Sequence, residues 1–183
     1  MKKLPIIKNS KWVDFMSSKK IDISGKVILM SFWTYPCVQC DRHMPYLREI
    51  WNSINHDKFL IIGVYTPTSK YGIDKKSTMD IVISLDINWS VIFDNEYKFC
   101  QKFQNELWPS LYLFDQEKNL VYGCYGKFKY IELKENIKNL LKKNHIVSNI
   151  FENKNPENVC FIEIPNTKKD DIKKSITEDC KLL

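Results

Sequence analysis

Arginine is nearly absent from this 183-residue sequence, which has only Arg42 and Arg48. The net charge of +6 therefore comes almost entirely from lysine. The lysines are spread along the chain and form no basic stripe with interleaved aromatic residues, so the sequence predicts a solvated surface and no nucleic-acid binding. Runs of about 20 apolar residues are also absent, which argues against a transmembrane helix.

Glycine is scarce as well, with five residues, whereas hydrophobic residues make up 44% of the chain. A chain of this length and composition can bury a substantial core without disulfide staples. The first segment, residues 1–9, is charged and has no apolar stretch of signal-peptide length. We therefore expect a cytoplasmic protein. The alternative is an extracytoplasmic protein whose export signal is absent from this chain.

The six cysteines include one closely spaced pair, Cys37 and Cys40, but no second pair that would complete a four-ligand zinc site. Covalent haem attachment needs a histidine directly after the second cysteine, where this chain has Asp41. The sequence thus implies no metal and no cofactor. Cys100 and Cys124 lie in an apolar helical pattern and in a predicted strand, and we expect them to be buried, inert thiols.

The cysteine pair follows an apolar strand and opens a helix. Residues 27–33 form a short continuous apolar run, as expected of a strand that is buried on both faces. Over about residues 38–54, apolar side chains recur at spacings of three and four, which predicts a helix with one buried face. We expect His43, within this segment, to be a polar residue on a partly exposed helix. Unpaired backbone N–H groups and the helix dipole stabilise a thiolate at the start of such a helix. Cys37 is therefore the predicted nucleophile, and Cys40, one turn later, is the predicted resolving thiol.

Two segments resemble the active-site signatures of thioredoxin-fold oxidoreductases. In the first, Phe32-Trp33 precedes the cysteine pair and Pro45 follows it; in the second, Trp108-Pro109 leads into an apolar run. The resemblance implies an α/β, thioredoxin-like fold with a central mixed sheet flanked by helices. It also implies that Pro45 kinks the active-site helix and that Pro109 is a cis-proline facing the dithiol. The implied substrate groove consists of Trp33, Pro36, Trp108 and Pro109.

The order of predicted elements resembles the TlpA and redoxin branch of this fold. More chain lies between the two signatures than a minimal thioredoxin needs, and the extra chain has the pattern of an inserted helix and strand. The segment from Gly63 to Pro67 and the late Trp108-Pro109 are similar to the thioredoxin-like domains of DipZ-type cytochrome c biogenesis proteins and of NHL-repeat proteins. The predicted elements after the first helix are strand 58–65, helix 74–85, strand 89–93, helix 95–105, strands 111–114 and 120–125, and helix 129–143.

We divide the chain into a lead-in (residues 1–20), a thioredoxin-like domain (21–145) and a C-terminal extension (146–183) that the family pattern does not predict. The extension ends in Cys180-Lys-Leu-Leu, which matches a C-terminal lipidation box. The alternatives are a chance cysteine, favoured by two acidic residues just upstream, and a pair between Cys160 and Cys180. We expect membrane attachment only if Cys180 is lipidated.

The predicted activity is thiol-disulfide exchange on disulfide-containing proteins, with an upstream thiol reductase or electron donor to recharge the dithiol. One departure weakens this prediction: Ser31 replaces the buried aspartate that helps thioredoxin to move the proton of the resolving cysteine, and serine is a poor base near neutral pH. A non-catalytic binding module with the same fold is the first alternative. A peroxiredoxin-like peroxidase is the second. Thr34-x-x-Cys37 favours it, whereas Met30 stands in place of the proline of that signature.

Overall fold

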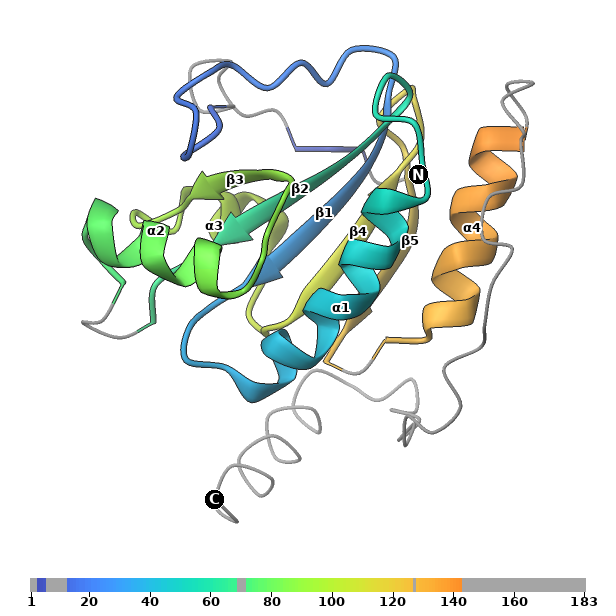
Figure 1. Ribbon diagram of the computed structural model, residues 1–183. Coiled ribbons are helices and arrows are strands. Elements are labelled where there is room, and N and C mark those ends of the chain that lie inside the picture. The colour runs from blue at the N-terminus through green and yellow to red at the C-terminus, as the bar shows by residue number, and fades with distance from the viewer. Residues whose placement is uncertain (1–2, 6–12, 69–71, 127, 143–183) are drawn as a thin grey trace.

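A mixed five-stranded sheet lies at the centre of the computed structural model (Figure 1). The structure describes residues 3–5, 13–68, 72–126 and 128–142. Its elements are, in chain order, β1 (Val27–Trp33), α1 (Val38–Asn52), β2 (Phe59–Tyr65), α2 (Lys75–Ser84), β3 (Ser90–Phe93), α3 (Lys98–Phe103), β4 (Ser110–Phe114), β5 (Leu120–Tyr125) and α4 (Tyr130–Lys142). The strand order β3-β2-β1-β4-β5 and the flanking helices confirm the predicted fold class, and α2 with β3 forms the predicted insertion. Among the described helices, none is long and apolar enough to cross a bilayer.

β1 is the central strand because its sequence has almost no polar residue. All seven of its residues are buried, and it pairs in parallel with β2 and antiparallel with β4. A parallel pair needs a crossover connection, which α1 supplies between β1 and β2. The C-terminal end of β1 therefore leads directly into the segment that carries the cysteine pair.

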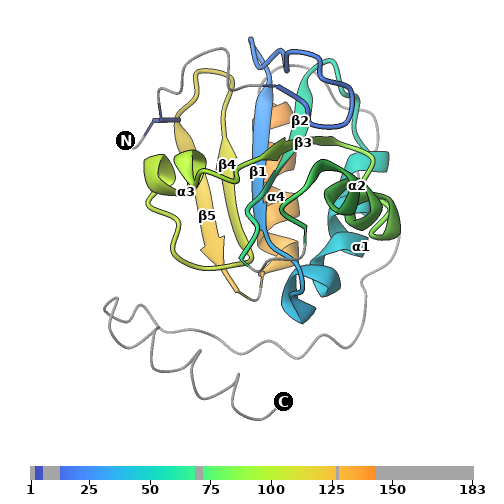
Figure 2. The same cartoon turned by 90° about the vertical axis from the view of Figure 1, so that its left-hand side faces the viewer.

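Side chains alternate along β1 between two core layers. Odd-numbered residues such as Leu29 pack in the layer that also holds the buried faces of α1, α2 and α4, which we call the α1 layer. Even-numbered residues such as Met30 pack in the layer that holds the buried face of α3, the α3 layer. Figure 2 shows α3 and α4 on opposite faces of the sheet. The sheet is thus buried on both sides at its centre.

The helix α3 is shorter than the sequence predicts. It spans Lys98–Phe103, inside the predicted helix of residues 95–105. Tyr97 and Gln104 flank it in the left-handed conformation, which interrupts helical geometry at both ends. The buried carboxylate of Asp94 accepts hydrogen bonds from two backbone N–H groups in the helix and so helps to fix where it begins.

N-terminal segments cover part of each sheet edge. Beside β3, the N–H of Phe15 donates to the carbonyl of Val91 at 2.6 Å, and the carboxylate of Asp14 accepts from the N–H of Val91 at 2.9 Å. Beside the start of β5, the N–H of Leu4 donates to the carbonyl of Lys118 at 2.7 Å. These bonds satisfy backbone groups that an open edge would offer to another chain.

Gly63 lies where two tryptophan side chains meet. It is in β2, opposite Ser31 on β1 and Val91 on β3. A Cβ atom at this position would lie 3.1 Å from Nε1 of Trp33 and 3.2 Å from Nε1 of Trp89. Both indole rings are buried in the α1 layer and have little freedom to move aside. The strand therefore needs glycine here for space.

We predict that Gly63→Ala lowers the free energy of unfolding by about 1–3 kcal/mol, because the methyl group overpacks a filled core. Urea denaturation measures the change. Gly123→Ala on β5 is the matched control, since a Cβ there has no neighbour nearer than 3.6 Å. The control should be neutral or stabilising by up to about 1 kcal/mol, because alanine restricts the unfolded chain more than glycine does. Equal destabilisation by both substitutions would contradict the steric explanation.

Candidate active site

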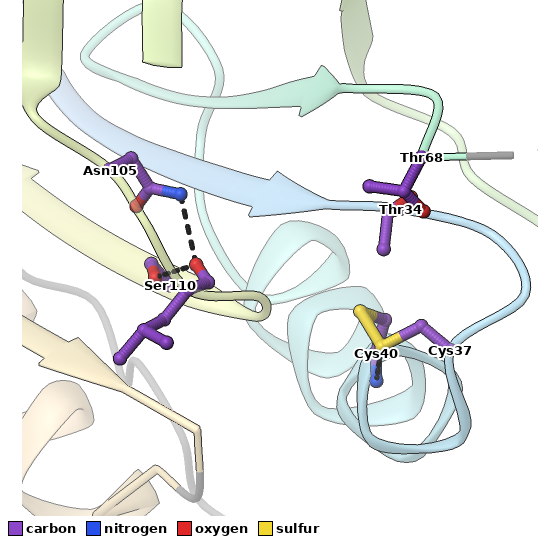
Figure 3. Close-up of a disulfide and its surroundings, with 7 residues drawn as sticks. Thr34, Cys37, Cys40, Thr68, Asn105 and Ser110 are labelled. Carbon is purple, nitrogen blue, oxygen red and sulfur yellow. Dashed lines mark hydrogen bonds between the residues drawn. A yellow bond between two sulfur atoms is a disulfide. The ribbon is translucent and has the colours of Figure 1, made fainter. Parts of the chain in front are cut away.

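The cysteine pair lies where β1 ends and α1 begins (Figure 3). Cys37 is the N-cap residue of α1, and Cys40 lies in its first turn. The two residues form a disulfide, and their Cα atoms are 5.2 Å apart. The N–H of Cys40 also donates a hydrogen bond to the sulfur of Cys37 at 3.1 Å. The predicted position of the pair at the start of the helix is confirmed.

The two cysteines differ in exposure. Cys40 is fully buried in the α1 layer, whereas Cys37 is half-buried. The residues on either side of Cys37 face solvent, and the Val38 side chain is 54% exposed. Cys37 is therefore the sulfur that a second protein can approach, while Cys40 is accessible chiefly to Cys37.

The segment of the second signature is held by its own hydrogen bonds. The Trp108–Pro109 peptide bond is cis; Pro109 is buried and Trp108 is half-buried. The carbonyl of Leu107 accepts hydrogen bonds from the amide of Asn105 at 2.9 Å and from the hydroxyl of Ser110 at 2.5 Å. Figure 3 shows this arrangement in the surroundings of the disulfide. The sequence pattern does not predict either polar partner, although both lie within four residues of Pro109.

A pair of threonines fixes the loop before Cys37. The hydroxyls of Thr34 and Thr68 are hydrogen-bonded at 2.8 Å (Figure 3). The N–H of Thr66 donates to the carbonyl of Trp33 at 3.0 Å. The loops that follow β1 and β2 are thus joined beside the site. The sequence interpretation involves Thr34 only as part of a peroxidase signature, and nothing in the sequence singles out Thr68.

The other predicted site residues have different surroundings. Trp33 is 1% exposed, and its ring packs on Tyr65 with ring centroids 4.6 Å apart. Its side chain therefore lies in the core and does not line the expected groove. Pro36 is exposed and follows a cis peptide bond. Pro45 lies inside α1, on its exposed side, where proline cannot donate to the carbonyl one turn earlier.

His43 is buried, which corrects the expectation of a polar residue on a partly exposed helix. It lies one turn after Cys40 and is 8% exposed. Its imidazole packs on the ring of Phe128, with ring centroids 3.6 Å apart, and its Nδ1 atom has no hydrogen-bond partner among the described residues. Burial lowers the pKa of His43 to about 4. The imidazole is therefore neutral at physiological pH.

Cys100 is buried, as expected, whereas Cys124 is half-buried. Burial raises the pKa of Cys100 to about 12 and that of Cys124 to about 11, so neither forms a thiolate near neutral pH. Both are free cysteines. The residues that the structure describes contain no cluster of side chains able to hold a metal ion. Cys160, Cys180 and the predicted extension lie outside the described residues.

Comparison with solved structures defines the class of fold. The structure is similar to a thioredoxin-like protein solved in its oxidised form, with a TM-score of 0.64 and 21% identity over 77% of this chain and 95% of that chain. It is also similar to StoA from Bacillus subtilis, with a TM-score of 0.60 and 16% identity over 69% of this chain and 94% of StoA. The protein therefore has a thioredoxin-like fold.

Comparison of sequences defines the family. The AhpC/TSA family matches residues 7–123, more than half of the chain, and the protein belongs to this family. It is 27% identical to protein DipZ of Mycobacterium bovis over 122 residues, which are 65% of this chain and 18% of DipZ. It is 25% identical to the thiol-disulfide oxidoreductase YkuV of Bacillus subtilis over 109 residues, 60% of this chain and 73% of YkuV. The resemblance inferred from the two signature segments is confirmed.

We predict that His43 makes the protein less stable as the pH falls from about 6.5 to about 4. In this window the unfolded chain protonates the imidazole, whereas the folded protein keeps it neutral. The difference between the pKa of His43 in the unfolded chain and in the folded protein corresponds to about 3 kcal/mol of stability. All of this stability is lost below about pH 4. Urea denaturation at a series of pH values in this range should show that the free energy of unfolding falls less steeply for His43→Phe than for the wild type. The exposed, matched His56→Phe should keep the wild-type slope, and identical slopes in all three proteins would refute the assignment.

Proposed function

We propose that the protein is a thiol-disulfide oxidoreductase in which Cys37 is the nucleophile and Cys40 the resolving thiol. The observation that carries this proposal is the half-buried Cys37 at a helix N-terminus, bonded to the fully buried Cys40. The backbone N–H groups of the first turn stabilise a thiolate at the N-cap position more than a thiol. A substrate disulfide can therefore meet an activated, accessible sulfur.

The reaction proceeds by two exchanges. The Cys37 thiolate attacks one sulfur of a substrate disulfide, forming a mixed disulfide and releasing the other substrate sulfur as a thiolate. Cys40 then loses its proton and attacks the sulfur of Cys37, which breaks the bond to the substrate. The substrate gains two electrons and leaves as a dithiol, and the protein is left with the Cys37–Cys40 disulfide seen in the structure. An upstream thiol reductase or other electron donor then restores the dithiol.

Disulfide-containing proteins are the proposed substrates. The exposed Pro36 and Val38, the half-buried Trp108 and the adjoining Pro109 form the proposed groove beside Cys37. The hydrogen bonds to the Leu107 carbonyl hold the Trp108 segment in place without a substrate. The side chain of Trp33 is excluded from this groove because it is buried. Cellular location stays a prediction, with the cytoplasm favoured over an extracytoplasmic compartment.

We predict that Cys37→Ser reduces insulin disulfides no faster than the dithiothreitol used to drive the assay, because the nucleophile is gone. Cys40→Ser should instead accumulate a mixed disulfide between Cys37 and the substrate, detectable by mass spectrometry. Cys124→Ser is the control and should retain wild-type activity, since its thiol stays protonated.

The same experiment includes a titration of the wild type in glutathione buffers, followed by alkylation and mass spectrometry. A reversible two-electron transition that is absent from Cys37→Ser supports the proposal. Failure to form the disulfide across the accessible range would overturn it and favour the binding module. Consumption of peroxide that depends on Cys37, without reduction of insulin, would favour the peroxidase.

We predict that Trp108→Ala lowers kcat/KM for a protein disulfide about tenfold, equivalent to about 1.4 kcal/mol of lost transition-state binding, and leaves the midpoint potential unchanged. The reason is that the indole contributes to substrate contact and takes no part in the electron transfer. Trp51→Ala is the control, because Trp51 stacks on His56 near the other end of α1. Equal losses in the two variants would refute the proposed groove.

A further inference from the structure

His43 and Cys40 lie together on the buried side of α1. They are three residues apart, so their Cβ atoms are about 5–6 Å apart on the same face of the helix. Cys40 is fully buried and His43 is 8% exposed. The ring of Phe128 covers the imidazole, while Nδ1 has no partner among the described residues. A proton acceptor is thus held one helical turn from the resolving thiol.

The other buried polar groups do not offer this chemistry. The described buried polar residues are Ser31, Thr34, His43, Thr66, Thr78, Asp94, Asn105 and Ser110. Among their side chains only those of His43 and Asp94 carry a basic or an acidic group. The carboxylate of Asp94 is already bonded to the N–H groups of Phe99 and Cys100, residues that pack in the α3 layer. The Oδ1 atom of Asp41, next to Cys40, is also buried without a partner among the described residues, but Asp41 as a whole is only half-buried. His43 is therefore the buried titratable residue near Cys40.

We propose that His43 is the proton-exchange partner of Cys40 during resolution of the mixed disulfide. The inference rests on the proposed dithiol chemistry and specifies where the proton of Cys40 goes. The proton passes from the Cys40 sulfur to Nδ1 of His43, and the Cys40 thiolate then bonds to the sulfur of Cys37. The substrate sulfur leaves with the electron pair of the broken bond and takes up the proton that His43 gives back. No further oxidant or reductant is required.

The redox state of the pair changes the charge that faces His43. In the disulfide form Cys40 is uncharged, and burial is the cause of the low pKa of the imidazole. In the dithiol form a Cys40 thiolate would raise the pKa of His43 by about 1–3 units, because opposite charges favour each other in apolar surroundings. The coupling is reciprocal, so His43 lowers the pKa of the Cys40 thiol by the same free energy.

Other titratable groups lie on α1 and on the elements that pack in the same layer, and they stay constant in the comparison. On α1 these are Asp41, whose half-buried carboxyl has its pKa raised by burial, and Tyr46. On α4 they are Tyr130, which packs on Tyr46, and Lys134, which is paired with Glu49. On β5 the thiol of Cys124 packs against the same layer. Because these groups are identical in the two redox states, a shift at His43 on reduction reports the Cys37–Cys40 pair.

The first test is a histidine titration by NMR on the wild-type protein, once as disulfide and once as dithiol. We expect the ring signals of His43 to shift when Cys40 loses its proton in the dithiol form, and to show no such step in the disulfide form. His56 is the control, because it stacks on Trp51 near the other end of α1 and its ring signals should not respond to Cys40. Ring signals of His43 that do not respond to deprotonation of Cys40 would overturn the inference.

The second test measures the pKa of Cys40 from its alkylation rate against pH in Cys37→Ser, with and without His43→Phe. Phenylalanine keeps an aromatic ring against Phe128, and thermal unfolding checks that the variant is folded. We expect His43→Phe to raise the pKa of Cys40 by at least one unit and to slow its alkylation at neutral pH about tenfold. His56→Phe should change neither. An unchanged Cys40 pKa would refute this inference alone, whereas failure of the wild type to form a disulfide would refute the proposed function.

Discussion

Burial of β1 on both faces is the constraint on which the rest of the structure depends. Its alternate side chains fill two core layers, and its pairing with β2 and β4 fixes its register. The chain must therefore leave the sheet directly after Trp33, and α1 begins a few residues later at Val38. The buried face of α1 packs in one of these two layers, the α1 layer, and this packing fixes the direction of the helix. The position of Cys37 at the helix N-terminus thus follows from the packing of β1 and α1.

The four described cysteines differ in their location. Cys37 combines access to solvent with the N–H groups of a helix terminus, whereas Cys100 and Cys124 have pKa values raised by burial. Cys40 is also buried, but its disulfide partner Cys37 lies only one helical turn away. In apolar surroundings an isolated charge is costly, so electron transfer at Cys40 has to be accompanied by movement of a proton. In the mechanism that we propose, the buried imidazole of His43 meets that requirement.

Local patterns of the sequence were sufficient for most of the fold. The apolar run of β1, the periodicity of α1 and the spacing of the cysteines depend on neighbours within a few residues, and the structure confirms all three. The helix α3 is shorter than predicted because the left-handed residues Tyr97 and Gln104 end it, and no periodic pattern reports backbone conformation. The sequence predicts that His43 is a polar residue on a partly exposed helix, because polar residues usually lie at the surface. Phe128, which covers it, comes from a segment far along the chain.

The sequence by itself determined the order of the elements and the placement of two cysteines at the start of a helix, because these depend on contacts between residues that are close in the chain. The tertiary structure alone decided which of the two sulfurs faces solvent, that the ring of Trp33 lies in the core, and that the imidazole of His43 is neutral. The physical reason is that exposure and desolvation are set by α4, β2 and the loops beside the site. Those segments reach α1 only when the sheet has assembled.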